Sequence, residues 1–166
     1  LVLDRHWNVV LTNAAAGAFA ALLPEHLVGP PMNVFRASLH PDGLAAHTID
    51  LDQWAGHLLT QLGRQVAITG DPGLIDIQRE VTSYPNVVDL RDRVDWTTPA
   101  EPPDLLVPFR LDLGGTELSM FTTLTTFGTP RDVTLDELAI ELFFPTDPAT
   151  SDFFQGTTAA VATSGQ

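Results

Sequence analysis

Residues 105–144 constrain the fold more than any other stretch, because three strand-like runs follow one another there. In residues 105–113 apolar side chains alternate with polar ones or proline, as in a strand with one buried face. Gly114-Gly115 follows, and glycine accepts the positive φ angles of a tight hairpin turn. Residues 116–127 and 138–144 add further alternating runs rich in β-branched and aromatic side chains. We therefore predict three adjacent antiparallel strands.

The link before the third run has two interpretations. Thr134 and Glu137 have the spacing of a capping box, which would make residues 133–138 a helical turn. The window is too short for periodicity to decide between a turn of helix and a strand. We expect a turn at residues 128–130, a second brief turn, and then the strand.

The beginning of the chain predicts a second hairpin. Residues 1–4 and 9–12 are short apolar runs, and the segment between them has turn character at Asp4 and Asn8. Asn13 then precedes an alanine- and leucine-rich segment, residues 14–23, where its side chain can cap a helix.

Three further helices are expected before residue 85. Asn33 should cap a short one, and Asp50 should cap the longest, over residues 51–66, whose apolar side chains fall on one continuous face. Asp71-Pro72 marks the start of the third, because proline is favoured at the first helical position. Residues 86–104 predict no clear element. Residues 146–166 resemble a loosely held tail with an anchor at Phe153-Phe154.

Two strands, then helices, then three strands predict an α+β fold in which helices cover a five-stranded antiparallel sheet, a PAS-like arrangement. At 166 residues the chain is long enough to bury a core. We expect one domain over residues 1–150, followed by a C-terminal tail over residues 151–166.

Composition limits the partners of the chain. The formal net charge is −13, and every basic side chain except histidine is arginine, so the chain should repel nucleic acid and anionic lipid. No apolar run approaches the roughly 20 residues of a membrane helix. There is no cysteine, which excludes disulfides and thiolate metal sites and is compatible with the cytoplasm.

Several stretches, in this order and spacing, resemble the MmyB-like ligand-binding domains of bacterial transcription regulators. The resemblance spans roughly residues 1–150 and rests on residues 3–13 (LDRHWNVVLTN), 32–35 (MNVF), 52–54 (DQW), 127–134 (FGTPRDVT) and 137–147 (ELAIELFFPTD). In that family a PAS-like domain follows an XRE-type helix-turn-helix, so the resemblance implies that the DNA-binding domain is absent from this chain. It also implies a small apolar or fatty-acid-like ligand, with no required cofactor.

Large apolar side chains are numerous enough to line a ligand cavity between the sheet and the helices. Ligand sites are typically apolar with a few polar groups, although the same residues could fill an ordinary packed core. The candidates are Phe19, Phe35, Trp54, Leu58, Phe109, Arg110, Met120, Phe121, Leu124, Ile140 and Phe144.

Arg110 lies in the middle of a predicted strand and has two interpretations. If it points inward, a ligand carboxylate could pair with its guanidinium. Alternation instead places it on the face opposite Phe109, in solvent.

Metal and catalytic sites have little support. His40, His47 and His57 lie within a short span but lack the i, i+4 spacing of a zinc-binding helix, so we expect no metal. No nucleophile elbow or phosphate-binding loop is present. The pairs Asp4–His6 and His47–Asp50 could act as acid and base only if the fold brought them into a cleft.

These observations favour the C-terminal small-molecule sensor of a bacterial regulator. Its partners would be the ligand, the DNA-binding domain of the same regulator and a second copy in a homodimer. The alternative is a PAS-like interaction or dimerisation module without a ligand, and the third hypothesis is a small α+β enzyme.

Overall fold

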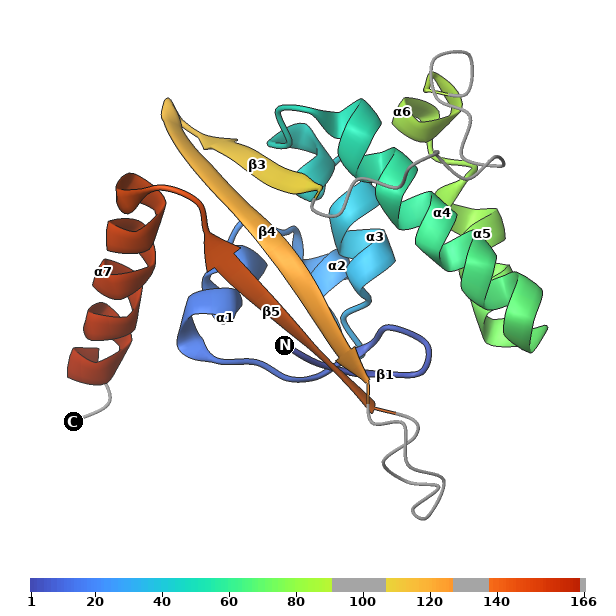
Figure 1. The fold of residues 1–166 in the computed structure, drawn as a ribbon, viewed down its shortest axis with the longest axis horizontal. Helices are drawn as coiled ribbons and strands as arrows, with labels where there is room; N and C mark the ends of the chain where they lie inside the picture. Colours follow the sequence, from blue (N-terminus) through green and yellow to red (C-terminus); the bar gives the residue numbers. More distant parts are fainter. Residues whose placement is uncertain (91–106, 127–137, 165–166) are drawn as a thin grey trace.

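The computed structural model describes residues 1–90, 107–126 and 138–164. Its centre is a five-stranded antiparallel sheet of order β2-β1-β5-β4-β3, packed against helices (Figure 1). The strands are β1 (Val2–Asp4), β2 (Val9–Leu11), β3 (Pro108–Leu113), β4 (Thr116–Thr126) and β5 (Leu138–Pro145). The predicted α+β class and five-stranded sheet are confirmed.

Both predicted hairpins are present. β3 and β4 pair up to Leu113 and Thr116, and between them Gly114 and Gly115 have φ angles of 66° and 92°, which glycine adopts without steric cost. β1 pairs with β2 on one side and with β5 on the other. The first strand of the chain therefore lies inside the sheet, beside β5, which is the middle strand.

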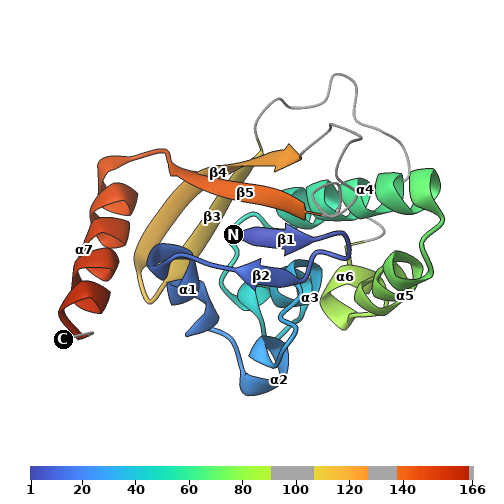
Figure 2. The same cartoon turned by 90° about the horizontal axis from the view of Figure 1, so that it is seen from below.

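The helices precede β3, except for one that follows β5. They are α1 (Ala14–Ala20), α2 (Glu25–Val28), α3 (Val34–Leu39), a 3-10 turn η1 (Leu44–Ala46), α4 (Leu51–Thr69), α5 (Pro72–Val81), α6 (Pro85–Val88) and α7 (Pro148–Ser164). Figures 1 and 2 place α7 at one end of the sheet and α4 and α5 at the other. None of the described helices combines the length and the apolar character needed to cross a bilayer.

The predicted caps hold at three helices. Asn13, Asn33 and Asp71 each accept hydrogen bonds from backbone N–H groups in the first turn of α1, α3 and α5. α1 is shorter than predicted, since the N–H groups of Leu22 and Leu23 bond to the carbonyls three residues back instead of four. These tighter bonds end α1 at Ala20. The short helix α2, which was not predicted, follows.

Asp50 occupies the cap position of α4 but makes no capping hydrogen bond with its side chain. Its carboxylate instead accepts from Arg110 in β3, at 2.5 Å. Glu117 in β4 takes a second hydrogen bond from the same guanidinium, at 2.6 Å. An ion pair between distant elements therefore replaces the expected local cap.

The predicted tail contains a helix. Asp147 accepts from the backbone N–H of Thr150 at 2.8 Å and from its hydroxyl at 2.9 Å. Asp147-Pro148 thus starts α7 as Asp71-Pro72 starts α5. The predicted anchor is confirmed at Phe154, whose ring packs edge-on against Phe19 of α1 with centroids 5.7 Å apart.

Two predicted segments fall wholly or partly outside the described residues. The turn at residues 128–130 and the capping box at Thr134 and Glu137 lie outside them, as do residues 91–104 of the connection. At residues 86–90, where no element was predicted, the short helix α6 buries Val87, and Leu90 is buried just beyond it.

The core lies between one face of the sheet and the helices. The apolar face predicted for α4 is buried there, and the Trp54 ring stacks on Phe109 of β3 at a centroid distance of 4.5 Å. Leu3, Leu111, Leu118 and Met120 are fully buried on the sheet side.

The opposite face of the sheet is also apolar, yet it is partly open to solvent. Phe121 and Phe144 stack there with centroids 5.1 Å apart, and Leu142 and Phe144 remain 44% and 40% exposed. Both faces of β5 therefore carry large apolar side chains.

Candidate functional site

An interior cavity lies where β1, β3 and β5 meet α1, α3 and α4. Its volume is about 50 Å³, and apolar side chains form most of its wall. The lining residues are Leu1, Ala16, Phe19, Ala20, Leu23, Met32, Val34, Ala37, Ser38, Leu44, Trp54, Phe109, Glu141 and Phe143.

Glu141 is the ionisable side chain among the described residues that line this wall. Alternation along β5 turns it inward with Phe143, whereas Ile140 and Leu142 point outward. It lies opposite Leu124 in β4 and exchanges backbone hydrogen bonds with Leu1, at 2.9 and 3.0 Å. The sheet therefore holds a carboxyl group against an apolar cavity.

Two polar atoms of this wall are buried without a partner. Glu141 is 5% exposed and Trp54 is 3% exposed. Neither Oε2 of Glu141 nor Nε1 of Trp54 has a hydrogen-bond partner within the part of the chain that the structure describes. Buried polar atoms are almost always paired, because an unpaired one costs about 1–3 kcal/mol. The cavity thus lacks one acceptor and one donor.

Burial has a direct electrostatic effect on Glu141. It raises the pKa of this carboxyl to about 7. The charged form is disfavoured because the apolar wall cannot solvate it. Glu141 can therefore change its charge near neutral pH.

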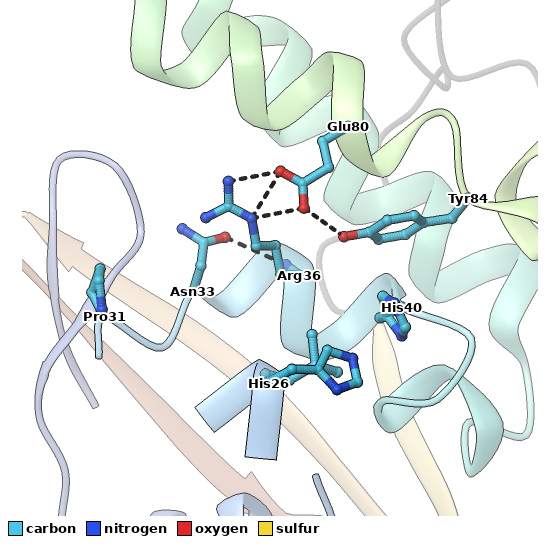
Figure 3. A pocket seen from close by; sticks show the side chains of 8 residues that line it. His26, Pro31, Asn33, Arg36, His40, Glu80 and Tyr84 are labelled. Carbon is cyan, nitrogen blue, oxygen red and sulfur yellow. Dashed lines mark hydrogen bonds and ion pairs between the residues drawn. The ribbon is translucent and has the colours of Figure 1, made fainter. Parts of the chain in front are cut away.

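A second, larger cleft of about 430 Å³ opens on the surface between α2, α3 and α5 (Figure 3). Arg36 donates from Nε and Nη2 to both carboxylate oxygens of Glu80, at 2.7–2.9 Å. Tyr84 donates its hydroxyl to the same carboxylate at 2.9 Å. This pairing lowers the pKa of Glu80, while burial and the bond to Glu80 raise that of Tyr84.

Arg36, Glu80 and Tyr84 in the cleft already bond to one another. A ligand for Arg36 or Glu80 would have to replace their mutual hydrogen bonds, whereas a ligand in the interior cavity would supply partners that are missing. The interior cavity is therefore the stronger candidate site.

One group of side chains at the edge of the cleft could hold a metal ion. Ligand atoms of His26, His40 and Asp42 lie within 4.8 Å of one another. Nδ1 of His40, however, already accepts from the backbone N–H of Asp42 at 3.1 Å, which leaves Nε2 of this ring for a metal. His57 is elsewhere, stacked on Trp54, and burial lowers its pKa.

The candidate acid–base pairs have structural partners. The carboxylate of Asp4 accepts from His6 N–H and Asn8 N–H and closes the turn of the first hairpin. His6 contacts Asp71, the cap of α5, at 3.0 Å. Asp50 pairs with Arg110.

The structure distributes the predicted site residues over three environments. Phe19, Trp54 and Phe109 line the interior cavity. Phe35, Leu58 and Met120 are buried in the core cluster beside it, and Leu124 packs against that cluster. The remaining four, Arg110, Phe121, Ile140 and Phe144, are not among the residues that line either cavity of the described chain.

Ile140 and Phe144 were expected in the cavity but lie on the outer face of β5. Ile140 pairs with Val2, and Phe144 pairs with Phe121, so Phe121 shares that face. The inward residues of β5 include Glu141 and Phe143, which were not among the predicted site residues. One signal in the sequence could have identified Glu141, because it is a charged residue with apolar residues on both sides in a strand.

The family model described as MmyB-like transcription regulator ligand binding domain matches residues 1–155. A search of curated proteins finds no match for the chain.

Proposed function

Since the chain belongs to the MmyB-like transcription regulator ligand-binding domain family, we propose that it senses a small, largely apolar molecule in the interior cavity. The full regulator would be a bacterial protein with an XRE-type helix-turn-helix, acting in the cytoplasm. The observation that carries the proposal is the cavity wall, which is apolar and contains two unpaired buried polar atoms. The strand order β2-β1-β5-β4-β3 supports a PAS-like sensor.

The cavity must enlarge to receive such a ligand. Its volume of about 50 Å³ is well below the roughly 300–1,000 Å³ of typical ligand pockets. Phe19 and Phe143 line it and pack with ring centroids 6.1 Å apart, and Phe154 of α7 lies against Phe19. Displacement of these aromatic rings would extend the cavity toward α7 for a fatty-acid-like or similar chain.

A signal could leave the cavity through β1. Leu1 lines the cavity and bonds to Glu141 through its backbone, and the resemblance implies that the DNA-binding domain precedes this strand. A ligand shifts a regulator only through different affinities for its two arrangements. The β1–β2 hairpin and the helices of residues 33–84 are the proposed moving parts. With a net charge of −13, the chain itself would not bind DNA.

Native mass spectrometry of the purified domain, followed by solvent extraction, tests the proposal. A co-purified apolar molecule should leave the protein when Ala20, in the cavity wall, is replaced by valine, because the added methyl groups fill the cavity. Ala67→Val, on the exposed side of α4, is the matched control and should keep the molecule. Retention by both variants would place the ligand elsewhere, and no bound mass in any preparation would count against the proposal.

A dimerisation module is the second candidate, favoured by the outer face of the sheet. Leu11, Leu142 and Phe144 are all exposed there, and exposed apolar patches often mark interfaces. The occupant would be a second copy of the chain. Light scattering after size exclusion should then give a dimer mass for the wild type and a monomer mass for Leu142→Glu.

A further inference from the structure

Glu141 is a buried carboxyl group without a counter-charge in the wall of the interior cavity. It is 5% exposed, and its Oε2 has no hydrogen-bond partner in the part of the chain that the structure describes. The nitrogen of Leu1 donates to the backbone carbonyl of Glu141 at 2.9 Å, so it does not pair with Oε2. No arginine, lysine or histidine is among the described residues that line the cavity. A positive hydrogen-bond donor is therefore the group that this wall lacks.

Three common head groups differ in how they meet this requirement. A carboxylate only accepts hydrogen bonds and would place a second negative group beside Glu141. A hydroxyl can donate to Oε2, but it leaves the charge of an ionised Glu141 uncompensated. An ammonium group donates and also neutralises that charge, which matters in an apolar wall because a buried carboxylate is tolerated only when it is paired. Glu141 is already desolvated in the folded chain, so binding does not add this cost again.

We propose that the ligand is an apolar amine whose ammonium group donates to the carboxylate of Glu141. Phe143 follows on the same inward face of β5, about 7 Å along the strand, and its ring packs against Phe19 with centroids 6.1 Å apart. Phe154 of α7 lies against Phe19, so the hydrocarbon chain would run from Glu141 along these rings toward α7. Aromatic rings also attract cations, as does a chain with a net charge of −13.

The head group needs to reach Glu141 alone. Trp54, whose indole nitrogen is also unpaired, stacks on Phe109 in β3, and β4 separates β3 from β5. The inference rests on the proposed function and adds to it the head group of the ligand.

A matched set of eight-carbon probes tests the head group. The dissociation constants of octylamine, 1-octanol and octanoate for the purified chain would be measured by ligand-observed NMR at pH 8 and pH 6. At pH 8 Glu141 is mostly ionised, because burial raises its pKa to about 7, and an alkylammonium group keeps its proton as lysine does. We expect octylamine to bind at pH 8 at least tenfold more tightly than octanoate and at least threefold more tightly than 1-octanol.

The change with pH gives a second readout. At pH 6 about nine in ten Glu141 carboxyls hold a proton that the ammonium group must displace, so octylamine should bind about tenfold more weakly than at pH 8. 1-Octanol is uncharged and bonds to either form of the carboxyl, so its affinity should change less than threefold. Equal octylamine affinities at the two pH values would contradict a contact with Glu141.

Three variants separate the contact from general attraction to an acidic chain. Glu141→Gln removes the charge and keeps the shape, so octylamine should bind at least tenfold more weakly at pH 8 and lose its pH dependence, while 1-octanol changes less than threefold. Glu25→Gln removes the same charge from the exposed surface of α2 and should leave all three affinities unchanged. An equal loss of octylamine in both variants would show a response to net charge alone. Ala20→Val should weaken all three probes, and octylamine binding that survives it would lie outside the cavity and overturn the proposal.

The outcomes distinguish this inference from the proposed function. Octanoate or 1-octanol binding to the wild type as tightly as octylamine at pH 8 would overturn the amine assignment and leave an apolar sensor intact. Failure of all three probes to bind would overturn both. If Glu141→Gln does not fold, the ratios of the wild-type affinities and their change with pH still decide the question.

Discussion

The guanidinium of Arg36 in α3 donates hydrogen bonds to both carboxylate oxygens of Glu80 in α5. The two residues are 44 positions apart in the sequence, so the pair links two separate helices. The pair is partly exposed, so its contribution is modest and sensitive to salt. Glu80→Gln should lower the free energy of unfolding by about 1 kcal/mol, measured by urea titration at pH 7. Asp76→Asn, which removes the charge from the largely exposed contact with Arg79, should have almost no effect.

The pH dependence of this pair has a definite sign. Arg36 lowers the pKa of the Glu80 carboxyl in the folded state. The stabilisation is therefore present above the unfolded-state pKa and is lost as pH falls through the folded-state value. A Glu80→Gln effect that stayed constant down to strongly acidic pH would contradict this account.

Asn33 is a buried cap with four hydrogen bonds. Its Oδ1 accepts from the N–H groups of Phe35 and Arg36, and its Nδ2 donates to the His6 carbonyl and to Asn8. Asn33→Ala should cost about 2 kcal/mol, because burial leaves these groups unpaired. Asn13→Ala removes the exposed cap of α1 and should cost about 1 kcal/mol or less. Equal costs in thermal unfolding would show that burial adds nothing.

Thr150 fastens α7 to the sheet. Its buried hydroxyl accepts from the backbone N–H of Ser119 in β4 at 2.9 Å and donates to Asp147 at 2.9 Å. Thr150→Val keeps the shape but leaves the N–H of Ser119 unpaired, whereas Asp147 still accepts from the backbone N–H of residue 150, so we expect a loss of about 1–2 kcal/mol. Thr146→Val, at an exposed hydroxyl that also bonds Ser119, should cost less. Hydrogen exchange in α7 should accelerate in the first variant alone.

Because of the raised pKa of Glu141, we expect the free energy of unfolding to fall as pH rises. Its folded-state pKa is raised from 4.5 to about 7, so between these values the folded chain holds a proton that the unfolded chain has released. The folded state thereby loses roughly 3 kcal/mol between pH 4 and pH 8. Glu141→Gln should remove this loss. The free energy of unfolding of the variant, relative to that of the wild type, should therefore be higher at pH 8 than at pH 5.

Urea titrations of both proteins across this pH range measure the difference directly. Glu25→Gln serves as the control, and its difference from the wild type should not vary over the same range. A Glu141→Gln difference that also stays flat would show that the Glu141 carboxyl is solvated in the folded protein.

The sequence predicts elements whose signals are local. Gly114-Gly115, Asn33 and Asp71-Pro72 each act within a few residues, and the structure has the predicted turn and caps. The same reasoning fails at Asp50, because a partner 60 positions away takes its carboxylate. It also fails at Asp147-Pro148. This pair has the same helix-start signal as Asp71-Pro72, yet we expected a tail there instead of the helix α7.

The inward face of β5 could not be predicted from alternation. Ile140, Leu142 and Phe144 form the more apolar side of this strand, and the rule that apolar faces turn inward selects them. The sheet instead buries Glu141 and Phe143 under the helices and leaves the apolar side half exposed. Such an exception to the polarity rule is expected where a protein keeps a binding site.

Arg110 provides the last test of how the ligand is recognised. An inward Arg110 would pair with a ligand carboxylate, but its guanidinium is held by Asp50 and Glu117, at 2.5 and 2.6 Å. Alternation along β3 sets it opposite Phe109, which lines the cavity. Arg110→Gln should therefore change the affinities of 1-octanol and octanoate less than twofold. Arg79→Gln, on the exposed surface of α5, is the matched control. A tenfold loss of octanoate binding in Arg110→Gln alone would restore the carboxylate interpretation.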